Sequence, residues 1–151
     1  SGADSITAHL REDRRHINDS DIKDIVTNFP GKLNLEMAAT EEMLNIALNI
    51  KPFSCCIVPE KREELTTEGG LDVLSKHNQL KKFIDPLKDA GIRTSFFVDA
   101  DEVQLEKSAD LDVDCLEIHC GSYCRAFDRS LNTCEDEFKK MILLRFEKYI
   151  Y

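Results

Sequence analysis

The chain has 151 residues, of which 42% are hydrophobic and 32% are charged. This length is typical of one domain with a sizeable core, and no apolar run reaches the roughly 18 residues of a membrane span. The formal net charge of −9 argues against a nucleic-acid-binding surface, whereas a small anionic substrate stays possible because its binding depends on local charge.

The six cysteines of the chain could belong to a disulfide framework or to a metal site. Cys55 and Cys56 lie in an apolar run, where a free cysteine behaves as a small hydrophobic residue. Cys120 and Cys124 are four residues apart beside His119, which is a weak zinc signal because structural zinc sites show tighter ligand pairs. We therefore expect reduced thiols, no metal and a cytoplasmic protein without membrane partners. A reduced metal-binding domain that uses His119, Cys120 and Cys124 is an alternative.

The first predicted element is a strand that leads into a charged loop. Apolar and polar residues alternate from Ile6 to Leu10, which is typical of a half-buried strand. Six polar residues follow at 11–16, and four of them are basic or imidazole side chains. A strand that ends in a charged loop is a common layout for an active site. His9 lies near the end of this strand, with the cations beside it.

The remaining elements alternate between helix and strand. We predict strands over 33–38, 53–59, 92–99 and 115–119. We predict helices over 18–29, 40–50, 72–90, 101–105 and 134–149. Pro86 should kink the third helix or restart it at Asp85, and 120–123 should be an exit loop. The polar segment 60–70, with its glycine pair, suits a mobile functional loop.

This order of five strand–helix units implies parallel strands with right-handed crossovers. Either a doubly wound open sheet or an arc of a (β/α)8 TIM barrel fits this order. No Gly-x-Gly-x-x-Gly follows a predicted strand, which weakens the dinucleotide-binding form of the doubly wound sheet. In a barrel, one face would gather the polar residues near the strand ends, which are His9, Glu36, Glu60, Asp99, Glu117 and His119. Five strands cannot close an eight-stranded barrel. We therefore expect 1–151 to be one domain, the central portion of a barrel without its first strand and its last two.

Three of these polar residues form a candidate proton-transfer site. His9 suits a general base or acid near neutral pH, although it could also be a core or surface histidine that bonds a carbonyl. Glu36 has apolar neighbours, and its burial would raise its pKa toward a useful range. It could instead form an ion pair with an arginine of the first loop. Glu117 occupies the same kind of position in the last strand.

Basic side chains on the predicted loops could bind phosphate. These residues are Arg11, Arg14, Arg15, Lys61 and Arg62. Acidic neighbours balance the charge of these residues, so one interpretation is a solvated face. The other is that the arginines capture phosphate with their forked guanidinium groups. Thr66 and Thr67 add hydroxyl donors on the longest loop, which could close as a lid.

Four motifs resemble the pyridoxine 5′-phosphate synthase family of the deoxyxylulose-dependent vitamin B6 pathway. They are HLREDRRHI at 9–17, NLEMA at 34–38, VPEKREELTTEGGLD at 58–72 and LEIHCGSY at 116–123. The resemblance implies a (β/α)8 barrel that assembles into an octamer. It also implies condensation of 1-deoxy-D-xylulose 5-phosphate with 3-amino-2-oxopropyl phosphate, which yields pyridoxine 5′-phosphate, inorganic phosphate and water without a cofactor.

The resemblance also implies roles for individual residues. His9 and Glu36 resemble the proton acceptors of the family, and Glu117 resembles its transition-state stabiliser. Arg11, His16 and Thr66 resemble its contacts to the deoxyxylulose phosphate. The family's Asn-x-Asp-His motif and its histidine proton donor have no counterpart in this sequence. A second hypothesis is therefore a non-catalytic fragment whose sheet edges are covered by another chain.

Overall fold

The computed structural model describes residues 2–60, 69–129, 135, 136 and 138. Strands and helices alternate along this part of the chain, as the sequence predicts. The strands are β1 (Ile6–His9), β2 (Leu33–Met37), β3 (Ser54–Ile57), β4 (Arg93–Asp99) and β5 (Cys115–His119). The helices are α1 (Asp19–Asn28), α2 (Glu41–Ile50), α3 (Val73–Asp89), α4 (Glu102–Asp110) and α5 (Gly121–Arg129).

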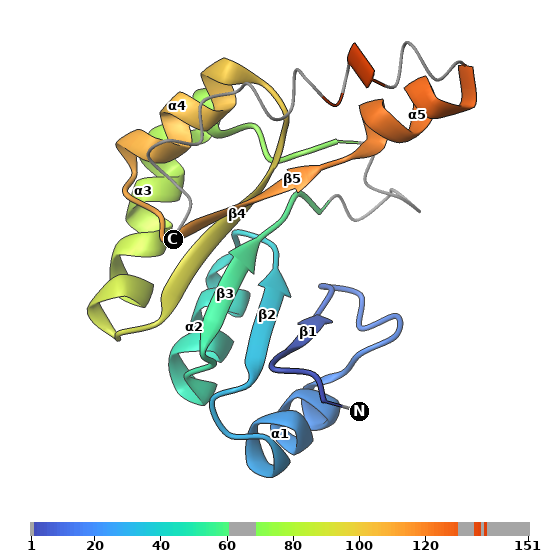
Figure 1. The fold of residues 1–151 in the computed structure, drawn as a ribbon. Coiled ribbons are helices and arrows are strands. Elements are labelled where there is room, and N and C mark those ends of the chain that lie inside the picture. Colours follow the sequence, from blue (N-terminus) through green and yellow to red (C-terminus); the bar gives the residue numbers. More distant parts are fainter. Residues whose placement is uncertain (1, 61–68, 130–134, 137, 139–151) are drawn as a thin grey trace.

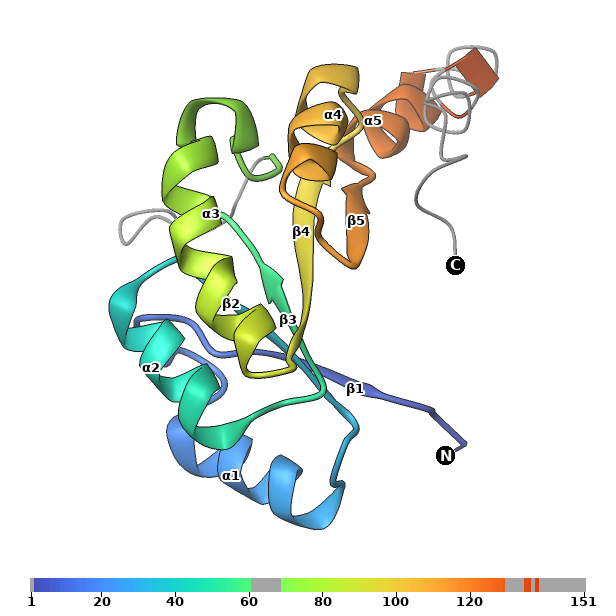
Figure 2. The same ribbon diagram turned by 90° about the vertical axis from the view of Figure 1, so that its left-hand side faces the viewer.

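The five strands form one sheet in the order β1-β2-β3-β4-β5, and every neighbouring pair is parallel (Figure 1). Helices α1 to α4 lie on the same side of this sheet, as Figure 2 shows. A doubly wound sheet would reverse its strand order and carry helices on both faces. The doubly wound alternative is therefore wrong, and the α/β fold is consistent with part of a TIM barrel.

The first four helices begin at side chains that accept otherwise unpaired backbone N–H groups. Asn18 accepts from the N–H groups of Ser20 and Asp21, and the Asp21 carboxylate accepts from the N–H of Asn18, which completes a capping box. Single side chains cap the other three helices, namely Thr40 for α2, Asp72 for α3 and Asp101 for α4. These caps fix the points at which the chain leaves each strand-end loop.

Helix α3 continues through Pro86 as one helix, so of the two expected effects of this proline, a restart at Asp85 does not occur. Pro86 lacks the N–H that would donate to the carbonyl of Lys82, but it lies in the last turn, and the helix continues for only three more residues. Phe83, Ile84 and Leu87 are buried around it, so packing against the sheet holds this turn. The helix ends, as predicted, just before Gly91, whose φ of +74° suits a left-handed terminus.

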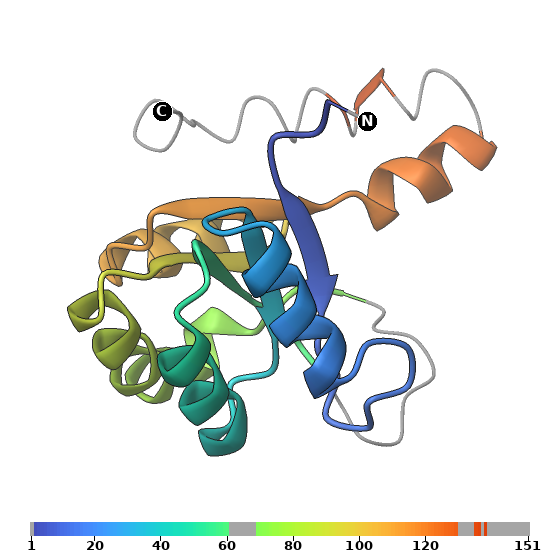
Figure 3. The same ribbon diagram turned by 90° about the horizontal axis from the view of Figure 1, so that it is seen from below.

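Helix α5 begins where an exit loop was expected at 120–123, and that expectation is wrong. The N–H of Cys124 donates to the carbonyl of Cys120, so helical bonding starts directly after β5. A Cβ at Gly121 would lie 2.7 Å from the His119 ring, so a larger residue at this position would have to displace that side chain. Helix α5 extends away from the helical layer (Figure 3). Most of the helix expected at 134–149 lies outside the described residues.

The hydrophobic core lies between the sheet and α1 to α4. Leu33, Leu35 and Met37 alternate along β2 and are at most 1% exposed, and they pack in one cluster with Met43 of α2 and Ile84 of α3. We call this side of the sheet the helix-covered face. Among the described residues, no helix combines enough length and apolar character to cross a membrane.

Candidate active site

The other side of the sheet, which we call the polar face, carries the alternate residues of the same strands. It includes Thr7, His9, Asn34, Glu36, Ser54, Cys56, Ser95 and Glu117. Strand pairing places His9 beside Glu36 and Glu36 beside Cys56. Because successive residues of a strand point to opposite faces, the apolar pattern of β2 itself directs Asn34 and Glu36 to this side.

His9 is the last residue of β1 and lies between two carboxylates. Its Nδ1 is 3.9 Å from Oε2 of Glu36, and its Nε2 is 3.3 Å from Oε2 of Glu60. The side chains of His9 and Glu36 are about one quarter exposed. The ring is therefore held by the protein and remains accessible from the polar face.

Glu36 has a pKa above its ordinary value, and burial is the main cause. The charge of His9 opposes this effect, while the negative charge of Glu117 adds to it. A raised pKa makes a carboxylate a better proton acceptor near neutral pH. His9 and Glu117 therefore each act electrostatically on Glu36, so the structure brings the three predicted residues together.

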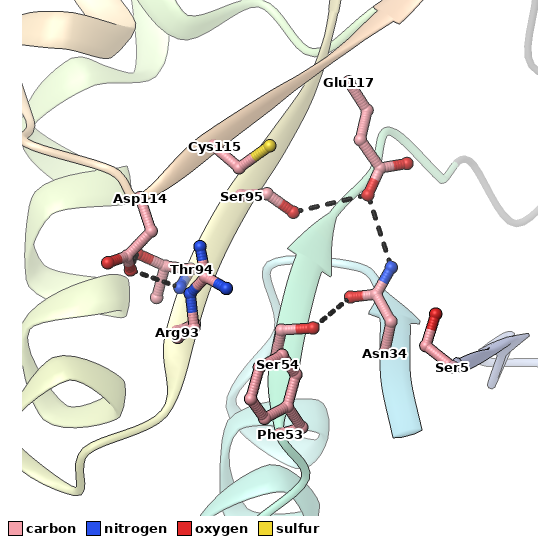
Figure 4. Close-up of a pocket in the computed structure, with 10 residues that line it drawn as sticks. All are labelled: Ser5, Asn34, Phe53, Ser54, Arg93, Thr94, Ser95, Asp114, Cys115 and Glu117. Carbon is pink, nitrogen blue, oxygen red and sulfur yellow. Dashed lines mark hydrogen bonds between the residues drawn. The ribbon is translucent and has the colours of Figure 1, made fainter. Parts of the chain in front are cut away.

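Glu117 is held by polar side chains from β2 and β4 (Figure 4). Its Oε1 accepts from Nδ2 of Asn34 at 3.3 Å and from Oγ of Ser95 at 3.4 Å. Ser54 in turn donates to Oδ1 of Asn34 at 2.7 Å, which fixes the orientation of the amide. These residues line a cavity of about 200 Å³ that also borders Arg93. The carboxylate of Glu117 therefore has a fixed position.

The loop after β1 is held in place by Arg14. Its Nε donates to Asp19 at 2.8 Å and its Nη2 to Glu42 at 2.6 Å, so it joins the loop to α1 and α2. Its Nη1 donates to the carbonyl groups of Arg11 and Glu12. The backbone of Arg14 has a φ of +53°, a strained conformation that these contacts maintain. Arg14 thus supports the loop, a role that the sequence left open.

The candidate phosphate ligands lie in different surroundings. Arg11 is 14% exposed and forms a forked pair with Asp13, with Nε–Oδ1 and Nη2–Oδ2 distances of 3.1 and 3.3 Å. This guanidinium lowers the pKa of Asp13. His16 is exposed on the same loop. Thr66, and the neighbouring basic residues at 61 and 62, lie outside the described residues.

Two polar residues of this site were not given a role from the sequence. Glu60 follows β3 and contacts His9, although its side chain is only 1% exposed. Asn34 precedes Glu36 by two residues and orients Glu117. The available signals were the strand-end position of Glu60 and the alternation that places Asn34 on the face of Glu36.

His119 and the two cysteines that follow β5 do not form a metal centre in the described structure. His119 Nδ1 lies 2.8 Å from Oδ1 of Asp99, and Cys120 Sγ lies 3.3 Å from the carbonyl oxygen of Ile118. Among the described residues, no group of three or more His, Cys, Asp or Glu side chains could hold a metal ion. The metal-binding alternative therefore has no support in this part of the chain.

Comparison with known proteins identifies the family. The family model described as pyridoxal phosphate biosynthesis protein PdxJ matches residues 1–144. This chain belongs to that family. Three similar relatives are each named pyridoxine 5′-phosphate synthase. The protein from Bradyrhizobium sp. (strain ORS 278) is 52% identical over 143 residues, which cover 94% of this chain and 56% of the relative.

The other two relatives of the PdxJ family show similar identity and coverage. The protein from Rhodopseudomonas palustris (strain BisB18) is 55% identical over 128 residues, 85% of this chain and 50% of the relative. The protein from Blochmanniella pennsylvanica (strain BPEN) is 50% identical over 135 residues, 89% of this chain and 55% of the relative. The chain thus spans about half the length of the curated relatives it matches.

Proposed function

We propose that this chain carries proton-transfer and sugar-phosphate-binding residues of a pyridoxine 5′-phosphate synthase. The reaction would condense 1-deoxy-D-xylulose 5-phosphate with 3-amino-2-oxopropyl phosphate and release inorganic phosphate and water. The observation that carries this proposal is the convergence of His9, Glu36 and Glu117 on one face of a parallel sheet in a PdxJ-family chain. Relatives with this activity in their names support it.

The geometry suits the proton transfers that such a condensation needs. Imine formation, enolisation, loss of water and ring closure each move protons between carbon, oxygen and nitrogen. His9 and Glu36 present a nitrogen and an oxygen 3.9 Å apart, so either can accept a proton from a substrate placed beside them. Glu117, held by Asn34 and Ser95, would stabilise positive charge that develops on an imine nitrogen.

The charged loop after β1 would bind the sugar phosphate. Arg11 supplies a guanidinium group whose fork matches phosphate oxygens once the phosphate takes the place of the Asp13 carboxylate, and His16 and Thr66 would add further donors. Arg14 holds the loop to α1 and α2, which limits the freedom that phosphate binding must remove. Local cations would thus serve two phosphorylated substrates in a chain whose net charge is −9.

The proposal extends to the setting of these residues. We infer that β1 to β5 correspond to strands two to six of a (β/α)8 barrel, and that this barrel assembles into a cytoplasmic octamer. The sequential order of five parallel strands supports the barrel. No cofactor is required, because proton transfer and electrostatic stabilisation suffice for each step.

A hybrid enzyme tests this function. Residues 2–129 of this chain would replace the matching segment of the Bradyrhizobium relative, and formation of pyridoxine 5′-phosphate from the two phosphates would be measured. We expect the hybrid to be active and His9→Ala to lower kcat by roughly 100-fold or more, the usual contribution of a general base. His77→Ala, on α3, is the matched control and should keep full activity.

Two outcomes would count against the proposal. A folded hybrid without turnover would favour the non-catalytic fragment, as would turnover that His9→Ala leaves unchanged. The purified chain should be assayed in parallel, because an active hybrid beside an inactive chain would show that the site needs elements from outside this sequence.

A further inference from the structure

We propose that Glu60 is a positioning residue, which holds His9 in the tautomer with the proton on Nε2 and thereby leaves Nδ1 as the proton-accepting atom. Its catalytic consequence rests on the proposed function, whereas the tautomer itself is a property of the chain. Sequence patterns assign no role to Glu60, whereas its contacts in the structure connect the segments that follow β1 and β3.

The first argument is the burial of Glu60. Its side chain is 1% exposed, and a buried carboxylate is costly unless polar partners surround it. Its Oε1 accepts from the backbone N–H of Glu12 at 2.9 Å, and Arg11 Nη2 lies 3.9 Å from the same atom. Its Oε2 faces Nε2 of His9 at 3.3 Å. Each of these partners belongs to β1 or its exit loop.

The second argument is the direction of the hydrogen bond to His9. An ionised carboxylate only accepts hydrogen bonds, so Nε2 must carry the proton that fills the 3.3 Å contact. In a neutral imidazole, the lone pair then lies on Nδ1. That atom faces Glu36, whose Oε2 is 3.9 Å away. The reverse tautomer would place the lone pair of Nε2 against the Glu60 carboxylate.

The third argument is the electrostatic surroundings of the ring. Glu60 approaches His9 from the β3 exit and Glu36 from β2, while Glu117 of β5 acts on Glu36. Arg11 is the cation that contacts Glu60 in the described structure. After His9 accepts a proton, the imidazolium lies between two carboxylates, so its charge is balanced without movement of the ring.

The fourth argument is that Glu60 links two strand ends. It lies three residues after β3 ends at Ile57, and its two oxygens contact the last residue of β1 and the loop beyond it. Together with Arg14, which joins the same loop to α1 and α2, this arrangement fixes both the ring of His9 and the guanidinium of Arg11. The same contacts of Glu60 and Arg14 would therefore position both the residue that transfers protons and the residue that binds phosphate.

The first test measures the tautomer of His9 in the unmodified chain. Ring nitrogen chemical shifts from ¹⁵N NMR distinguish the two neutral forms, and His9→Gln assigns the signals. We expect the Nε2–H form to dominate. Dominance of the Nδ1–H form would overturn the proposal directly, and this result requires neither an active enzyme nor a variant of Glu60.

The second test uses Glu60→Gln, which preserves the shape of the side chain. The amide has one acceptor oxygen, so if this atom still accepts from Glu12 N–H, its NH2 group faces Nε2 of His9. The amide would then donate to Nε2 and force the proton to Nδ1. We expect the tautomer to invert, while Glu106→Gln, an exposed substitution on α4, leaves it unchanged.

Kinetics of the hybrid enzyme then separate positioning from simple support. Inversion of the tautomer should lower kcat by roughly 100-fold with little change in KM, because the wrong histidine tautomer removes the base and leaves substrate contacts intact. If the hybrid that retains Glu60 shows no turnover, and Glu60→Gln still inverts the tautomer of His9, the proposed function is rejected and the positioning role is retained. An active hybrid in which Glu60→Gln changes neither tautomer nor kcat would reject the positioning role alone.

Discussion

The two faces of the sheet are built from the same strands and do different work. Along β2, Leu33, Leu35 and Met37 enter the core under the helices, while Asn34 and Glu36 between them face the candidate site. Two residues adjacent in one strand therefore differ more in their surroundings than two residues of different strands that lie on the same face of the sheet. Glu36 interacts with His9 and Glu117, from β1 and β5, rather than with its own chain neighbours.

This difference shows how the fold separates stability from chemistry. The helix-covered face contributes burial of apolar surface, which is the main favourable term in folding. The polar face carries coupled carboxylates and hydroxyl groups, whose burial costs free energy unless they are paired. Substitutions on the helix-covered face should consequently cost more stability than substitutions on the polar face, and three substitutions test this comparison.

The largest expected effect is on the helix-covered face. Leu35 is fully buried, so Leu35→Ala removes apolar contacts and leaves a cavity. It should lower the free energy of unfolding by about 2–5 kcal/mol. Urea denaturation followed by circular dichroism measures this loss. If Leu35→Ala were as stable as the original chain, the core would not lie where the structure places it.

A smaller effect of opposite sign is expected one residue further along β2. Burial raises the pKa of Glu36 in the folded state, so the stability present below the unfolded pKa is lost as pH rises through the folded pKa. Glu36→Gln cannot ionise and should escape this loss. Unfolding measured between pH 4 and pH 8 should show the variant gaining stability relative to the original chain as pH rises. A difference that stays constant with pH would contradict the raised pKa.

The smallest effect should come from a hydrogen bond on the polar face. Ser54 donates to Asn34 at 2.7 Å, and Asn34 orients Glu117. Ser54→Ala should therefore cost about 1 kcal/mol of unfolding free energy, the usual net value of such a bond. The same denaturation experiment measures it, with Ser5→Ala, an exposed position bordering the same cavity, as the control. Equal losses for both variants would show that the bond to Asn34 has no special value.

The periodicity of apolar residues predicted most of the fold, because residues on the helix-covered face are apolar and those on the polar face are not. The alternation in 33–38 located β2, and the same alternation placed Glu36 away from the core. Polar residues at strand ends located His9 and Glu117 in the same way. That these residues act in proton transfer stays a prediction, since the geometry establishes only that they lie together.

The remaining features depend on contacts that no local pattern records. Glu60 contacts His9 across 51 residues, and Asn34 reaches Glu117 across 83. The continuity of α3 through Pro86 depends on burial of its last turn, and Gly121 brings the start of α5 close to the His119 ring. Each of these outcomes was decided by tertiary packing, which overrides local preference.

The sequential order of the strands also has a consequence for how this chain folds. Within the described residues, every strand pairs only with the strand before or after it in the sequence, so each pairing closes a loop that contains one helix. The entropy of closing such loops is similar along the chain and grows only slowly with length. Loop-closure entropy therefore gives no single pair of neighbouring strands a large advantage as the point at which pairing starts.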